Sequence, residues 1–172
     1  MRVRLKQPSL IDEPPFLAAA RRSRTFLQRW APPLCTSNAY RAYLRRLGRP
    51  THEGRLVVLR ASGELVGVIN VSEIVRGAFR SGYLGYYAFV PHARRGYMTE
   101  GLALALRWAF GELRLHRVEA NIQPNNRASR ALVRRLGFRR EGFSPRYLKV
   151  AGRWRDHERW ALLAEEWKGG AV

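Results

Sequence analysis

The sequence predicts a single α/β domain built on a mixed sheet of about six strands, mostly antiparallel, with helices packed against it. Three observations support this fold class. The chain has 172 residues, of which 46% are hydrophobic, and this suits one domain with a sizeable core. Short runs rich in valine, isoleucine and aromatic residues alternate with longer runs of helical periodicity. No repeat, low-complexity segment or linker divides the chain, so we expect one domain over residues 1–172.

The first half of the chain predicts two helices followed by three strands. Apolar residues recur at helical spacing over 14–30, and prolines then end this helix. A second apolar stripe, over 37–48, ends at a glycine. The strands are rich in β-branched and aromatic residues, and a Ser-Gly-Glu turn joins the first two. They cover residues 55–60, 65–75 and 81–90.

The second half alternates helices and strands. A long apolar stripe predicts a helix over 97–113, and alternation predicts a strand over 116–123. A helix over 124–138 follows, with an asparagine N-cap and a glycine at its C-terminal end. Two closing strands, 146–150 and 153–163, meet at a glycine turn. The central strand–helix–strand step predicts a right-handed crossover that places its two strands parallel.

Arginine dominates the charge of the chain, and the formal net charge is +19. Two interpretations remain open: a solvated basic surface, or an electrostatic role such as weak attraction to RNA or the ribosome. No apolar run is long enough to span a membrane, and the first residues lack the apolar stretch of a signal peptide. Cys35 is the only cysteine, so no internal disulfide is possible. These features predict a cytoplasmic protein without a membrane partner. For the oligomeric state, a monomer and a homodimer both remain open.

The stretch PHARRGYMTEG, residues 91–101, joins a predicted strand to a predicted helix through a glycine. The first N–H groups of a helix have no partner within it, and the helix dipole adds partial positive charge there. Such a turn can bind phosphate. Gly96 allows a ligand to approach the backbone closely, and Arg94 and Arg95 add positive charge. Taken by itself, the pattern also fits a turn that binds nothing.

Two segments in this order, GYYAFVPHARRGYMTEGLALALRWAF and VEANIQPNNRASRALVRRLGFRREGF, resemble the GNAT superfamily of acetyl-CoA-dependent N-acetyltransferases. Within it, the chain is most similar to the RimJ/RimL type, the ribosomal-protein-alanine N-acetyltransferases. The resemblance runs from about residue 10 to 165 and is strongest over 82–148. It implies acetyl-CoA as the acetyl donor and a GNAT-like sheet of six to seven strands in which one parallel pair splays apart.

The resemblance implies two elements that bind the coenzyme. Pantetheine pairs with the open edge of a strand, and the loop that follows binds the diphosphate through main-chain N–H groups. The family's loop motif, Gln/Arg-x-x-Gly-x-Gly/Ala, keeps only its middle glycine here, because Ala93 and Met98 stand at its first and last positions. Asn126 and Ser129 match the family's Asn-x-x-Ser, although Asn126 also suits a helix N-cap. The coenzyme-binding residues implied in this way are Ala88, Phe89, Val90, Arg94, Arg95, Gly96, Tyr97, Met98, Thr99, Asn126 and Ser129.

Two catalytic positions of many relatives differ in this chain. The tyrosine that protonates the thiolate is replaced by Val133, and the glutamate that serves the amine is replaced by Asn121. We therefore predict that Asn121, or Glu119 through a water molecule, positions the amine. Ser129 is predicted to donate to the departing thiolate, as the RimL-like resemblance implies. An ion pair with one of the many arginines is the alternative role of Glu119.

The acceptor wall is predicted, from resemblance and position, to consist of Trp30 and the segment 30–43, and Tyr86 and Tyr87 are further candidates for binding the acceptor. Because Tyr86 and Tyr87 point to opposite faces of their strand, one of them should face the cleft. No cluster of cysteine and histidine exists, so no metal site is predicted. The histidines, His157 among them, are scattered singly and are predicted to be solvated or structural.

Acetylation by direct attack in a ternary complex requires a neutral amine, a polarised thioester carbonyl and a proton for the leaving thiolate. We predict transfer of acetyl from acetyl-CoA to a primary amine, with the N-terminal α-amine of a protein, such as a ribosomal protein, as the favoured acceptor. A small-molecule amine or an antibiotic is an alternative acceptor. A non-catalytic, basic RNA- or ribosome-binding module on the same fold is the alternative from another class.

Overall fold

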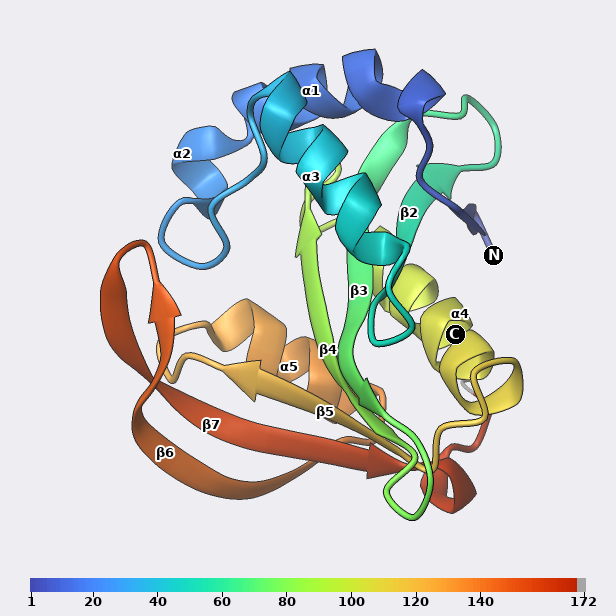
Figure 1. Cartoon of the computed structure of the whole chain (residues 1–172), viewed down its shortest axis with the longest axis vertical. Helices are drawn as coiled ribbons and strands as arrows, with labels where there is room; N and C mark the ends of the chain where they lie inside the picture. The colour runs from blue at the N-terminus through green and yellow to red at the C-terminus, as the bar shows by residue number, and fades with distance from the viewer. Residues whose placement is uncertain (170–172) are drawn as a thin grey trace.

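A computed structural model describes residues 1–169 and shows one open sheet of seven strands (Figure 1). The strand order is β1-β2-β3-β4-β5-β7-β6. Neighbouring strands are antiparallel except β4 and β5, which are parallel as the crossover predicted. The strands are β1 (Val3–Lys6), β2 (Glu53–Leu59), β3 (Leu65–Val75), β4 (Ser81–Ala88), β5 (Arg117–Ile122), β6 (Arg139–Val150) and β7 (Arg153–Leu163).

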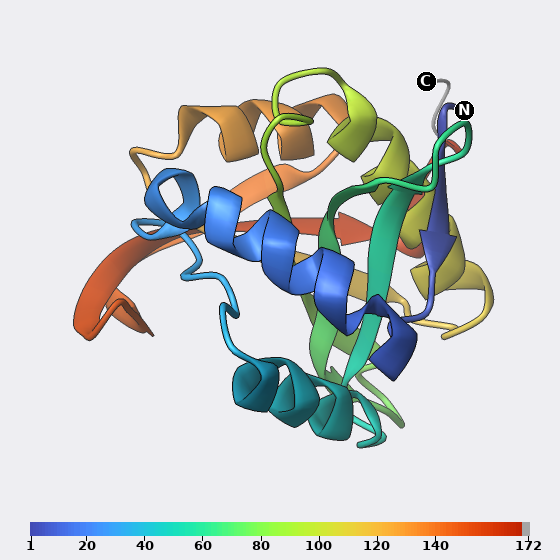
Figure 2. The same ribbon diagram turned by 90° about the horizontal axis from the view of Figure 1, so that it is seen from above.

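Helices cover both faces of this sheet. Helices α1, α2 and α3 lie on one face, and α4 and α5 lie on the other (Figure 2). Within residues 1–169, no helix combines the length and the apolar character needed to cross a membrane. The helices are α1 (Glu13–Arg22), α2 (Arg24–Leu27), α3 (Ser37–Leu47), α4 (Tyr97–Gly111) and α5 (Arg127–Arg135).

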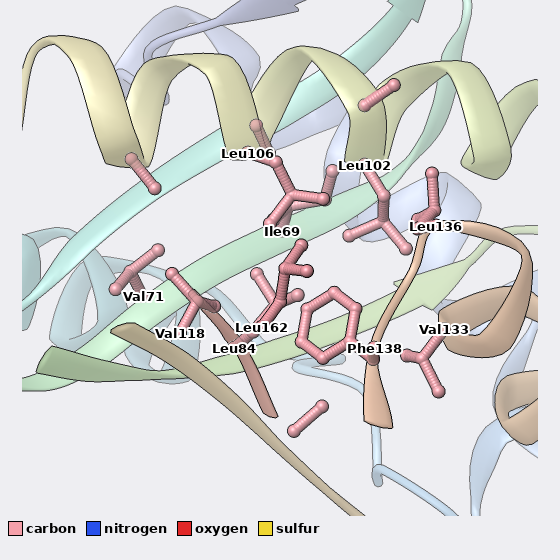
Figure 3. Close-up of a cluster of buried hydrophobic side chains, with 14 of the residues drawn as sticks. Ile69, Val71, Leu84, Leu102, Leu106, Val118, Val133, Leu136, Phe138 and Leu162 are labelled. Carbon is pink, nitrogen blue, oxygen red and sulfur yellow. The ribbon is translucent and has the colours of Figure 1, made fainter. Parts of the chain in front are cut away.

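Each face of the sheet buries its own hydrophobic core, because successive residues of a strand point to opposite faces. Toward α4 and α5, Ile69 of β3 belongs to a cluster that includes Leu106 of α4 (Figure 3). Toward α1 and α3, Val68 of β3 belongs to a cluster with Phe16 and Tyr40, whose ring centroids lie 4.6 Å apart. Each fully buried side chain of this size contributes about 1.5–3 kcal/mol. The sheet is therefore fixed from both sides.

The predicted helix over 14–30 is wrong in two respects, because it is broken at Ser23 and its second part ends at Leu27. Its first part ends at Arg22, and α2 is a single turn. The Ser23 side chain is buried, and its hydroxyl donates to the Ala19 carbonyl at 2.7 Å. The same hydroxyl accepts the main-chain N–H of Val90 at 3.0 Å. A tertiary contact with the chain that follows β4 thus overrides the local helical pattern.

The ends of the sheet also differ from the prediction. The four-residue edge strand β1 was not predicted, because its pairing with β2 rather than its own pattern stabilises it. The strand predicted over 146–150 begins already at Arg139, and most of its side chains are exposed, so it shows no clear alternation. The strand predicted over 81–90 ends at Ala88.

β4 and β5 separate partway along their length. Their ladder consists of three pairs, from Ser81–Arg117 to Tyr83–Glu119. Beyond Tyr83, β4 continues for five residues, to Ala88, still paired with β3 on its other side. β5 continues to Ile122, paired with β7. The two strands therefore diverge, as the resemblance implied, and leave a gap in the middle of the sheet (Figure 1).

Candidate active site

The loop between β4 and α4 presents a row of unpaired main-chain donors. Arg94 has φ +64° and Gly96 has φ +80°, both in the left-handed region, and α4 begins at Tyr97. Within residues 1–169, the N–H groups of residues 94–98 have no hydrogen-bond partner. Successive backbone donors in such a turn, at the N-terminus of a helix, form a concave site for an anion. The loop can therefore hold a diphosphate through its backbone, whatever the side chains are.

A buried carboxylate in the first turn of α4 is paired with the N-terminal segment. Glu100 accepts from Nε of Arg2 at 2.6 Å and from the main-chain N–H of Arg2 at 2.5 Å. Burial raises the pKa of Glu100, but the hydrogen bonds from Arg2 outweigh it and hold this pKa below its ordinary value. Glu100 therefore stays charged and paired, and its charge does not oppose an anion at the neighbouring amides.

A cavity of about 630 Å³ passes through the gap between β4 and β5, from this loop to the end of α2. Within residues 1–169, no group of three or more histidine, cysteine, aspartate or glutamate side chains lies together in a way that could hold a metal ion. The predicted site residues that line the cavity are Trp30, Tyr86, Tyr87, Ala88, Arg94, Gly96, Met98, Thr99, Asn121, Asn126 and Ser129. The predicted residues outside its lining are Phe89, Val90, Arg95, Tyr97 and Glu119.

The backbone of β4 offers a free edge at Ala88. Phe89 donates its N–H to the carbonyl of Val66 at 2.7 Å, and Val90 donates its N–H to the Ser23 hydroxyl at 3.0 Å. Backbone groups alternate in direction along a strand, so those of Ala88 point away from β3 and into the gap. Among the three residues predicted to pair with pantetheine, Ala88 is the one whose N–H has no hydrogen-bond partner within residues 1–169. The side chain of Phe89 is fully buried in the core.

Glu119 lies where the paired part of β4 and β5 ends, opposite Tyr83. Its carboxylate accepts from Nε of Arg117 at 2.8 Å. Arg117 also binds Glu141 through both of its terminal nitrogens. These contacts match the ion pair that the sequence offered as the alternative role of Glu119.

Asn121 stands beyond this point, where β4 has left β5. Its Oδ1 is buried and has no hydrogen-bond partner in the described part of the chain. Every second residue of β5 belongs to the core under α4 and α5, namely Val118, Ala120 and Ile122. Asn121 lies between two of them, so its side chain points to the opposite face, toward α1–α3. Leaving a buried polar atom unpaired costs about 1–3 kcal/mol. A ligand that donates a hydrogen bond here would recover that cost.

Tyr86 and Ser129 meet across the gap on the other face. The Tyr86 hydroxyl lies 2.6 Å from Oγ of Ser129, and it also donates to the Ser129 carbonyl at 3.3 Å. Asn126 caps α5 by accepting the Ser129 N–H at 3.2 Å, which fixes this turn. Burial raises the pKa of Tyr86 to about 12, so its phenol is neutral at physiological pH. Tyr86 therefore faces α5 and not the side of α1–α3 where Asn121 points.

Tyr87 and Trp30 lie on the side of α1–α3. Tyr87 packs against the hydrophobic cluster of that face, and burial raises its pKa. Trp30 follows α2, and the guanidinium of Arg29 lies 5.5 Å from the centre of its ring. Nε2 of Gln123 donates to the Arg29 carbonyl at 3.3 Å, which joins the end of β5 to this segment. The wall of the cavity on this face is therefore formed by residues that follow α2 and by the ends of β4 and β5.

Sequence reasoning missed several residues of this site. His157 of β7 was predicted to be solvated or structural, yet it lines the cavity and is only 3% exposed. The pairs Arg2–Glu100 and Tyr86–Ser129 were also missed, because their members are 98 and 43 residues apart. No local pattern in the sequence marks such contacts.

A second cavity, of about 880 Å³, adjoins the first at the loop. Gly96, Thr99 and Arg135 border both. Glu166 is the acidic residue of its walls, and Arg139 binds it at 2.9 Å. Positive side chains otherwise surround this space, so it suits an anionic group attached to the one held by the loop. Its cationic residues are Arg2, Arg135, Arg139 and Lys168.

The single parallel pair of the sheet, which separates beyond three residue pairs, is a feature that the sequence resemblance implied. Residues 2–139 match the model of the acetyltransferase (GNAT) domain. The chain belongs to this family, as the sequence resemblance implied.

Among curated relatives, the chain is 41% identical over 107 residues to the [ribosomal protein uS5]-alanine N-acetyltransferase of Escherichia coli K12. This match covers 62% of the chain and 55% of the relative, so the chain spans little more than half of that protein's length. Among solved structures, Mycobacterium smegmatis RimJ in complex with CoA-disulfide matches with a TM-score of 0.87 and 31% identity, over 95% of this chain and 83% of that one. The spermidine N-acetyltransferase of Vibrio cholerae, in complex with CoA and spermine, matches with a TM-score of 0.81 over 96% of this chain and 97% of that one; at 18% identity it shows the fold alone.

The free amides around Gly96 predict a specific defect in the Gly96→Ala variant. A side chain at φ +80° is strained, by about 1–3 kcal/mol, and the strain would reorient the loop. We expect the Kd for CoA, measured by calorimetry, to rise about tenfold or more.

Gly63→Ala provides a matched control. Gly63 has φ +74° in the hairpin between β2 and β3, and a Cβ there meets open space. Its substitution should lower the thermal stability to a similar degree while the Kd for CoA stays at the wild-type value. Wild-type affinity in Gly96→Ala would contradict the assignment of the loop.

Proposed function

We propose that this protein transfers acetyl from acetyl-CoA to a primary amine, and that its preferred acceptor is the N-terminal α-amine of a protein, such as a ribosomal protein that begins with alanine. One observation carries the proposal: a single cavity is lined by three residues of the loop with free amides, by the open edge of β4 at Ala88 and by Asn121 with its unpaired oxygen; the three loop residues are Arg94, Gly96 and Met98. The loop amides suit an anion, the strand edge suits an extended chain with amide groups, and the Asn121 oxygen suits a hydrogen-bond donor. Acetyl-CoA supplies the first two groups, as its diphosphate and its pantetheine, and the acceptor amine supplies the third.

The binding of acetyl-CoA follows from these features. The diphosphate takes the amides of the loop, and the second cavity with its cationic walls accepts the phosphorylated nucleoside end. The pantetheine amides pair with the backbone groups of Ala88. The thioester then lies in the gap, between the Tyr86–Ser129 pair on one face and Asn121 on the other.

The charge of the cavity favours a peptide over a polyamine as the acceptor. Within residues 1–169, the lining includes no aspartate or glutamate, but it includes Arg94, Arg127 and Arg135. A polyamine would bring several ammonium groups into this space, where each loses hydration without gaining an opposite charge. An α-amine brings one charge, and its pKa of about 7.7–8.0 leaves a usable neutral fraction near neutral pH. The relation to the E. coli uS5-alanine enzyme supports the same choice.

The chemistry divides between the two faces of the gap. On the side of α1–α3, Oδ1 of Asn121 accepts a hydrogen bond from the amine and orients its attack on the thioester carbonyl. On the side of α5, the Ser129 hydroxyl donates to the sulfur as the C–S bond breaks. In this step the neutral phenol of Tyr86 donates to Oγ of Ser129, which leaves the serine hydrogen free for the sulfur. Glu119 is not needed for this scheme, because Arg117 occupies its carboxylate.

The charge of the cavity predicts the order of acceptors. Peptides that begin with alanine and continue with acidic residues should be acetylated with a kcat/KM about tenfold or more above matched peptides that continue with lysines, and above spermidine. Mass spectrometry of the products measures this, and added salt should narrow the difference. A preference for spermidine would contradict the acceptor class. Binding of CoA without transfer to any amine would contradict the enzyme and favour a non-catalytic binding module.

The Tyr86–Ser129 pair predicts matched kinetic defects. Ser129→Ala and Tyr86→Phe should each lower kcat about tenfold or more, with the KM for acetyl-CoA little changed, because the pair acts on the leaving sulfur. The kcat of the double variant should be close to that of Ser129→Ala, since both substitutions remove the same Tyr86–Ser129 hydrogen bond. Ser72→Ala, on β3 outside the cavity, serves as the control. Full turnover in Ser129→Ala would contradict this role.

A further inference from the structure

His157 is a buried side chain in the wall of the cavity, and the acetyl-transfer scheme given above assigns it no role. We propose that its Nε2 accepts the proton of the incoming ammonium group, so that His157 is the general base of the reaction. This inference rests on the proposed acetyl transfer and adds a catalytic residue to it. It also fills a role that Glu119, engaged with Arg117, leaves open.

The register of the sheet places His157 on the face where the amine arrives. β5 and β7 pair Asn121 with Arg159 and Ile122 with Glu158, and the next step along this register sets His157 opposite Gln123. Residues two apart on a strand share a face, and directly paired residues do too. His157 and Asn121 therefore point to the same side of the sheet, toward α1–α3. Their diagonal spacing on adjacent strands, about 7–8 Å, leaves room for an amine between the two side chains.

The backbone selects the tautomer of the imidazole ring. Nδ1 of His157 lies 2.9 Å from the carbonyl oxygen of Arg155. A carbonyl oxygen can only accept, so Nδ1 carries the hydrogen and the lone pair of the neutral ring is on Nε2. The Nδ1 hydrogen bond persists when Nε2 takes up a proton. The ring is thus held in one orientation with its basic nitrogen free.

Within residues 1–169, no carboxylate forms an ion pair with the His157 ring, because the acidic side chains beside it on β7 bind other groups. Asp156 accepts the main-chain N–H of Arg146, and the carboxylate of Glu158 binds Arg130 at 3.0 Å. Both side chains belong to neighbours of His157 on its strand and point to the other face. Ser144 of β6, which pairs with His157, and Gln123, the residue after β5, are uncharged. The titratable and charged groups next to His157 are Tyr147 on β6, with ring centroids 6.3 Å apart, and Arg155, Asp156, Glu158 and Arg159 on β7.

The substrate nitrogen gives up two protons in this step. One N–H bond of the ammonium group breaks and its proton passes to Nε2 of His157, which later releases it to water. The freed lone pair forms the C–N bond to the thioester carbon, and the C–S bond breaks. A second proton leaves the nitrogen and reaches the sulfur through the hydroxyl of Ser129. The products are an amide, free CoA thiol and one proton in solution.

The His157→Asn variant tests this role, because its amide can still donate to the Arg155 carbonyl. At pH 7 we expect kcat/KM for the peptide to fall about 100-fold, with the Kd for CoA unchanged. The loss should shrink as the pH rises above about 8, where the free α-amine is already neutral. His116→Asn, outside the cavity and beside Glu165, is the control and should keep the wild-type pH profile.

The results separate this inference from the proposed function. If the wild type transfers acetyl and His157→Asn keeps its rate at all pH values, or loses the same factor at every pH, His157 is not the base. If the wild type transfers acetyl to no amine, the proposed function fails and this inference fails with it. A thermal melt confirms that the variant folds. Should it not fold, His157→Gln takes its place in the same pH series.

Discussion

The separation of β4 and β5 beyond the Tyr83–Glu119 pair is the constraint on which the rest of the site depends. A strand that loses its neighbour leaves backbone groups without partners inside a protein, which is costly unless something binds them. Here the exposed edge at Ala88 borders a passage that connects the face of α4 and α5 with the face of α1–α3. A ligand bound on one face can thus present its end to the other.

Several contacts hold the two strands apart. The Ser23 hydroxyl takes the N–H of Val90, and the ring of Phe89 is buried beneath α1. On the other side, β7 occupies the far edge of β5 along its whole length. Beyond the Tyr83–Glu119 pair, each strand therefore makes its hydrogen bonds on the side away from the gap, β4 with β3 and Ser23, and β5 with β7. This explains why the broken helix α1–α2 matters for the site: its break at Ser23 provides the hydroxyl that caps the end of β4.

The charges of the site reinforce this geometry. The free amides of the loop and the arginines of both cavities attract an anionic coenzyme, and Arg2 neutralises Glu100, the one carboxylate in the first turn of α4. The surplus of positive charge, +19 over the chain, is compatible with an acidic or ribosome-bound acceptor. The faces of the gap then differ in chemistry, with hydroxyl groups toward α5 and an amide and an imidazole toward α1–α3.

The sequence predicted the parts of this arrangement that local patterns encode. The apolar stripe of α4, the glycine before it and the N-cap at Asn126 were all visible, and the crossover rule made β4 and β5 parallel. The splay came from family resemblance, because no local signal marks where two strands part. The contacts of Arg2 with Glu100 and of Tyr86 with Ser129 join distant segments, so only the folded chain shows them. His157 went unrecognised for the same reason: its place depends on the register of β7 against β5.

A crystal structure with bound acetyl-CoA would be the sharpest test of this mode of coenzyme binding. We expect diphosphate oxygens within hydrogen-bond distance of the N–H groups of residues 94–98, pantetheine along the backbone of Ala88, and the thioester in the gap between Ser129 and Asn121. A coenzyme bound on another surface, or one whose thioester stays outside the gap, would contradict it.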